Sequence, residues 1–61
     1  DEIKWIIKGH LHVARIFEDK EKWEEAKIIY KKIVEYDTEK SVFAQERLEI
    51  VEENLKLENN N

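Results

Sequence analysis

Two histidines, His10 and His12, are the first residues whose chemistry can be judged from their spacing. Residues two apart on a helix project to faces that do not converge, whereas metal-binding pairs stand three or four apart. The chain contains no cysteine, so no thiolate could complete a zinc site. We therefore expect both histidines to be packed or solvent-facing, and we expect no bound metal.

Nucleophilic catalysis and phosphate binding also lack the residues that they need. Ser41 is the only serine, and no histidine lies near it in the sequence, whereas an activated serine needs a base within hydrogen-bond reach. The single glycine cannot form a glycine-rich phosphate loop. We expect no catalytic residue, no cofactor and no enzymatic activity.

Carboxylates are numerous near the C-terminus. General acid–base catalysis requires a pocket that shifts the pKa of a carboxyl group, and one helix face supplies no pocket. We therefore interpret the acidic cluster as a solvated face, and the alternative is a docking surface that steers a basic peptide. The four glutamates of this cluster are Glu46, Glu49, Glu52 and Glu53.

The composition excludes several classes of protein. Proline is absent and 43% of the residues are charged, which does not fit a sandwich or barrel rich in turns. A net charge of -4 argues against a nucleic-acid binder, which normally carries a basic excess. No apolar run approaches membrane-spanning length. We expect a soluble protein, in the cytoplasm rather than the periplasm, that binds neither nucleic acid nor membrane.

The spacing of apolar residues predicts an all-α fold of three helices. Apolar residues recur three and four apart and place helices at about 2–19, 22–36 and 40–57, with turns at 18–22 and 37–41. The first helix should direct one face toward the core, comprising Ile3, Ile6, Ile7, His10, Val13, Ala14 and Phe17. Residues 1–58 should then form one domain, and the polar 59–61 a frayed tail.

Residues 8 to 38 resemble a tetratricopeptide repeat, a helical hairpin of about 34 residues. The resemblance rests on the motifs Trp23-x2-Ala26-x3-Tyr30-x2-Ile33 and His10-x2-Val13-Ala14-x2-Phe17. It implies an antiparallel hairpin followed by a third helix that either begins a next repeat or caps the array. Thr38 stands where the family usually has proline, which leaves exchange of the third helix between molecules possible.

The same resemblance implies a protein–protein interaction module that binds a partner peptide or another copy of the chain. The concave binding surface of the family would be formed here by Lys8, Leu11, Arg15, Asp19, Gln45 and Glu49. Leu11 and Arg15 occupy the places of the clamp that some members use to hold a peptide carboxylate. We therefore do not expect the chain to bind chaperone tails.

The third predicted helix carries two apolar stripes instead of one. Ala44, Leu48, Val51 and Leu55 can pack on the first two helices. A second stripe would lie in water unless another helix covered it, so we expect a homo-oligomer. The alternative to a peptide-binding module is a purely structural self-assembling unit. The expected self-association face comprises Phe43, Ile50 and Leu57, with Trp5 at the opposite edge.

Overall fold

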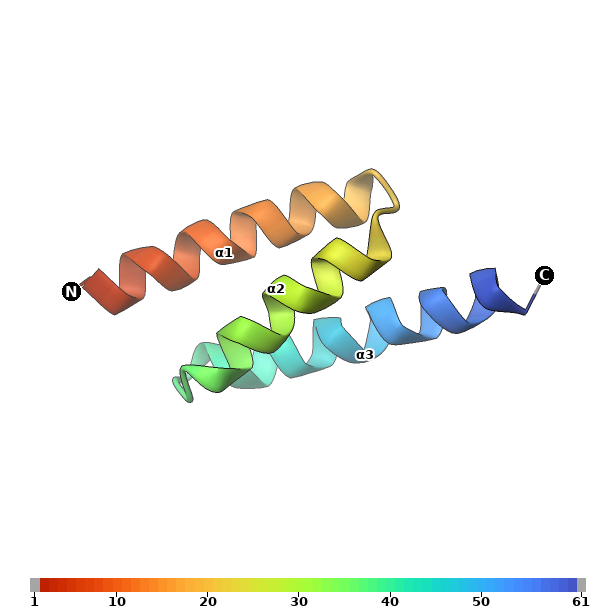
Figure 1. Cartoon of the computed structure of the whole chain (residues 1–61). Coiled ribbons are helices and arrows are strands. Elements are labelled where there is room, and N and C mark those ends of the chain that lie inside the picture. Colours follow the sequence, from red (N-terminus) through yellow and green to blue (C-terminus); the bar gives the residue numbers. More distant parts are fainter. Residues whose placement is uncertain (1, 61) are drawn as a thin grey trace.

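The computed structural model describes residues 2–60 and contains three α-helices in that range (Figure 1). They are α1 (Glu2–Asp19), α2 (Trp23–Glu35) and α3 (Lys40–Asn59). The predicted all-α class and three-helix order are confirmed, and each predicted boundary lies within two residues of the observed one. Residue 61 of the predicted tail lies outside the described residues, but Asn59 belongs to α3, so the tail prediction is wrong at that position.

Helix α2 lies between the other two helices (Figure 1). It packs extensively against both α1 and α3, whereas α1 and α3 touch each other only slightly. The Cα atoms span 44 × 19 × 12 Å, so the chain forms one thin layer of helices. One long side of α1 and one of α3 therefore have no helix against them.

The core lies along both sides of α2. The predicted inner stripe of α3 is confirmed, because Ala44, Leu48 and Val51 are buried and Leu55 packs against the core. The largest fully buried side chains are Tyr30, Ile33 and Val51, and Ile7, Ala14 and Ala26 complete the buried apolar set.

The predicted core face of the first helix is partly wrong. Ile7 and Ala14 are buried, but Ile3, Ile6 and Val13 are exposed. Two neighbouring apolar stripes run along α1, and α2 covers only the one that contains Ile7 and Ala14. The spacing of apolar residues could not distinguish these stripes, because both repeat with the helical period.

The first turn closes by hydrogen bonds that end α1. The Lys22 N–H donates to the Phe17 carbonyl at 2.8 Å and the Glu21 N–H to the Glu18 carbonyl at 2.9 Å, which is the Schellman pattern of helix ends. Glu21 occupies the left-handed position of this motif, with a φ of 59°. This position favours glycine, because a Cβ atom makes the conformation costly.

The second turn is closed by a reciprocal pair of side-chain hydrogen bonds. The Thr38 hydroxyl accepts from the Lys40 N–H at 3.2 Å, and the Ser41 hydroxyl accepts from the Thr38 N–H at 3.0 Å. This arrangement resembles the reciprocal bonds of a capping box, although the residue directly before α3 is Glu39, whose side chain makes no capping hydrogen bond. Helix α3 begins two residues after Thr38, at Lys40, and packs antiparallel to α2 (Figure 1).

Replacing Glu21 with glycine should stabilise the protein. Glycine adopts a positive φ without the Cβ clash, so we expect the free energy of unfolding to rise by about 0.5–1 kcal/mol, as measured by urea denaturation. The control is Lys31→Gly in the middle of α2, which should lose about 1 kcal/mol. A Glu21→Gly variant that loses stability would contradict the turn geometry.

Candidate functional site

One buried carboxylate joins all three helices. Glu18 of α1 is only 7% exposed, and it accepts hydrogen bonds from the Tyr30 hydroxyl of α2 and from the Arg47 guanidinium of α3. A second bond runs from Arg47 Nε to Glu18 Oε2 at 3.3 Å. Both carboxylate oxygens are therefore engaged, as a buried charge requires.

The network raises the pKa values of Tyr30 and Arg47. Burial, reinforced by the hydrogen bond to Glu18, raises the pKa of Tyr30 from 10.0 to about 12. The hydrogen bond with Glu18 also raises the pKa of the Arg47 guanidinium. Tyr30 therefore remains a neutral hydrogen-bond donor and Arg47 a cation at ordinary pH.

The sequence interpretation missed this network. The sequence analysis places Glu18 in the first turn, at 18–22, and gives Arg47 no role. The missed signal is that Glu18 continues the core stripe of α1, following Ile7 and Ala14 by helical spacing. A carboxylate on a core stripe needs a buried cation or donor, and here α3 supplies the cation, Arg47, and α2 supplies the donor, Tyr30.

A groove of about 470 Å³ lies between the N-terminal half of α1 and the turn that leads into α3. Its α1 side combines apolar side chains with Lys4 and Lys8, and the turn contributes Thr38, Glu39 and Lys40. The apolar lining residues are Ile3, Ile7 and Leu11. The groove thus includes Lys8 and Leu11 of the predicted concave surface.

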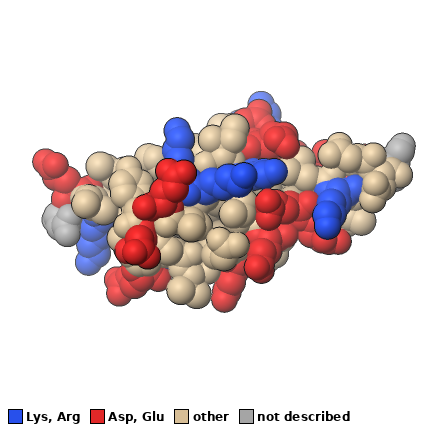
Figure 2. All heavy atoms as spheres, turned by 60° about the horizontal axis from the view of Figure 1, so that its bottom comes forward, with Lys and Arg blue, Asp and Glu red and all other residues tan. Residues whose placement is uncertain are grey.

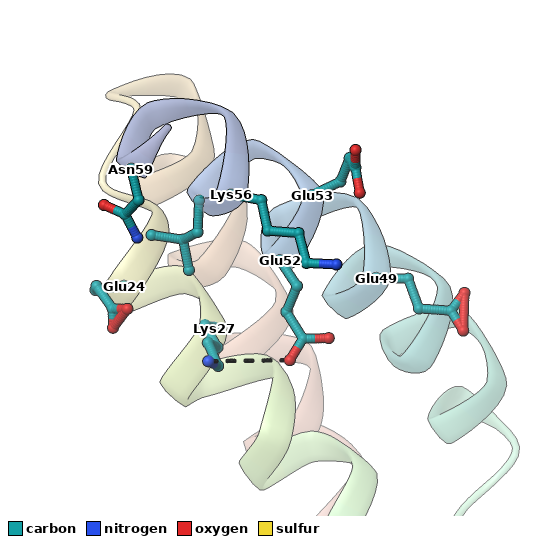
Figure 3. Close-up of a pocket in the computed structure, with 8 residues that line it drawn as sticks. Glu24, Lys27, Glu49, Glu52, Glu53, Lys56 and Asn59 are labelled. Atoms are coloured by element: carbon teal, nitrogen blue, oxygen red, sulfur yellow. Dashed lines mark ion pairs between the residues drawn. The ribbon is translucent and has the colours of Figure 1, made fainter. Parts of the chain in front are cut away.

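A second groove, of about 520 Å³, lies between α2 and α3 and is highly charged (Figure 3). Lys27 and Glu52 point toward each other across it, with 3.9 Å between Nζ and Oε2. Glu49 and Glu53 line the same groove. Figure 2 shows acidic side chains interspersed with lysine and arginine on the visible face. Within the acidic cluster, Glu46, Glu49 and Glu53 are exposed to solvent. Docking of a basic peptide on them stays a prediction.

The structure does not gather the six predicted concave residues in one place. Lys8 and Leu11 line the first groove, whereas Glu49 lines the second. Arg15 and Asp19 form an exposed ion pair along α1, with 3.5 Å between Nε and Oδ1. Gln45 is exposed and lines neither groove. Peptide binding by these residues stays a prediction.

The second stripe of α3 lies on the surface, as the sequence predicts. Phe43, Ile50 and Leu57 are 48%, 44% and 59% exposed. Trp5, which was expected at the opposite edge, is 70% exposed on α1, with the Lys8 ammonium 5.4 Å from its ring centroid. The structure thus leaves all four residues of the expected self-association face accessible to a partner.

The remaining chemistry-bearing residues do not converge. Among residues 2–60, no three His, Asp or Glu side chains are placed to hold a metal ion. His10 instead packs edge-on against the Tyr36 ring, with 6.4 Å between centroids. Within the same residues, no helix has both the length and the apolar character needed to cross a membrane.

Comparison with family models, with curated proteins and with solved structures yields no match for this chain. Within residues 2–60, the structure itself shows an all-α layer of three helices. Its function has to be inferred from its own surfaces.

Replacing Tyr30 with phenylalanine should weaken folding in a pH-dependent way. Losing a buried hydrogen bond to a carboxylate should cost about 1.5–3 kcal/mol near pH 8. Between pH 10 and 12 the unfolded chain loses the phenol proton while folded Tyr30 keeps it. Wild-type stability should therefore fall across this window by up to about 3 kcal/mol more than that of the variant.

The measurement is the difference in unfolding free energy between wild type and Tyr30→Phe from pH 8 to pH 12. Lysine titration affects both proteins and cancels in this difference. Tyr36→Phe is the control, because its ring is partly exposed and makes no contact with Glu18. A difference that stays constant with pH would contradict the buried phenol–carboxylate bond.

Proposed function

We propose that the chain is a protein–protein interaction module that associates with another helix through the outer stripe of α3, defined by Phe43, Ile50 and Leu57. The observation that carries the proposal is the exposure of all three side chains on one line of a helix. Apolar side chains seven apart lie on one side of a helix, which is the spacing of helix-packing positions.

The surface of the whole chain supports this proposal. Its accessible area is 4677 Å², compared with about 4200 Å² expected for a compact 7.4 kDa monomer. Among residues 2–60, eleven large apolar side chains are exposed, whereas eight hydrophobic residues are buried. A core this small stabilises a chain only weakly, so covering the outer apolar side chains would add substantially to its stability.

A module of the tetratricopeptide type is the form of the proposal that the resemblance favours. In that form α1 and α2 are one repeat hairpin, and α3 is the first helix of a next unit. Ala26, which is fully buried between the helices, suits the close helix approach of that family. The alternative is a purely structural self-assembling unit without a peptide groove. Both forms use the outer stripe of α3.

Changing Phe43 and Ile50 together to glutamate should abolish association. The two charges would have to be buried against the partner, so we expect a monomer in light scattering coupled to size-exclusion chromatography, whereas wild type should exceed the mass of one chain. The matched control is Ile28→Glu with Val42→Glu, which adds the same charge at exposed positions outside the stripe.

Circular dichroism should show that the double variant keeps its helices, which separates lost association from unfolding. Wild type that remains monomeric at millimolar concentration would overturn the proposal. So would a Phe43→Glu/Ile50→Glu variant that associates as strongly as the control.

A further inference from the structure

Beyond Glu2 in its first turn, the outer side of α1 carries apolar side chains and has a notch among them. Ile6, Val13 and Ile16 are exposed at helical spacing, and Gly9 lies among them. About two and a half turns separate Gly9 from buried Glu18, so Gly9 faces away from the core. A Cβ atom added at Gly9 would meet nothing within 4 Å. We call Ile6, Gly9, Val13 and Ile16 the α1 face.

The notch has no explanation within one chain. Glycine in the middle of a helix destabilises it relative to alanine, and here nothing in the same chain approaches the glycine. A glycine between larger side chains is the shape that accepts a knob from another helix at close range. The α1 face is therefore suited to receive a projecting apolar side chain.

Charge indicates which helix fits this face. Between residues 3 and 17, α1 carries Lys4, Lys8 and Arg15 and no Asp or Glu. Helix α3 carries five glutamates against three basic residues, and one of those, Arg47, is already paired with Glu18. Over its full length α1 has no net charge, because Glu2, Glu18 and Asp19 balance these three basic residues. Two α3 helices would therefore repel each other, whereas α1 presents Lys8 and no excess of negative charge to an incoming α3.

We propose that the α1 face of one chain receives the Phe43, Ile50 and Leu57 stripe of a second copy, so that chains stack head to tail. The inference rests on the proposed function and adds the surface to which α3 binds. Lys8, beside Trp5 at the edge of the α1 face, would then meet the glutamates that flank the incoming stripe. Those glutamates are Glu46 and Glu53.

The fold itself allows such stacking to continue. Because α1 and α3 are the two outer helices of one layer (Figure 1), a neighbouring α3 packed on α1 extends the layer by another three helices. Such a contact joins two different surfaces, so a stack of any length still has a free α1 face at one end and a free α3 stripe at the other. Wild type should therefore form a series of masses that grows with concentration, beyond a dimer.

Two variants test the contact by complementation. The α1 variant is Gly9→Leu with Val13→Glu, and the α3 variant is Phe43→Glu with Ile50→Glu. Each variant alone should be monomeric in sedimentation velocity, because each has lost one of the two surfaces. An equimolar mixture should form a complex of two chains that grows no further, because one intact α1 face and one intact α3 stripe remain.

Gly9→Leu alone checks the notch without threatening the fold. A Cβ atom at this exposed position meets nothing within 4 Å, and leucine favours helix more than glycine does, so the monomer should melt at a higher temperature. Association should nevertheless weaken at least tenfold, because the side chain fills the notch. An unchanged affinity would show that the notch is not at the contact.

The outcomes separate the inference from the proposed function. If the α3 variant is monomeric and the α1 variant still associates like wild type, the inference is wrong and the proposed function stands. Two monomeric variants that fail to form a complex on mixing would also overturn the inference. Wild type that stays monomeric at all concentrations would overturn both.

Discussion

The buried carboxylate of Glu18 is the constraint on which the arrangement of the three helices depends. Helices α1 and α3 touch only slightly, yet Glu18 and Arg47 connect them and Tyr30 connects both to α2. An unpaired carboxylate in this position would be strongly destabilising. The network therefore favours the one placement of α1 relative to α3 in which all three groups meet.

This placement determines which surfaces remain uncovered. With α2 in the middle, α1 and α3 each cover it with one side and expose the other. The exposed sides carry apolar side chains in a chain too small to form a large core. Association would stabilise the folded chain by mass action, because a partner binds the folded layer and not the unfolded chain.

The helices and most of the core could be predicted from the sequence, because both follow from local spacing. Ala44, Leu48 and Val51 were placed correctly, since their stripe repeats three and four residues apart, whereas the second stripe of α3 repeats only every seven. Ile6 and Val13 of the α1 face were wrongly placed in the core, since two adjacent apolar stripes on α1 fit the same helical period. The network of Glu18 was missed because its partner Arg47 lies 29 positions away in the sequence. Local spacing can place Glu18 on the core stripe, but it cannot report that pairing.

A double-mutant cycle between Glu18 and Arg47 tests most directly whether this network holds the layer together. The unfolding free energies of wild type, Glu18→Gln, Arg47→Met and the double variant would be measured by urea denaturation. We expect a coupling energy of about 1–3 kcal/mol, because either single change leaves the other partner without its counter-charge. Effects that add to within about 0.5 kcal/mol would contradict this account of the fold.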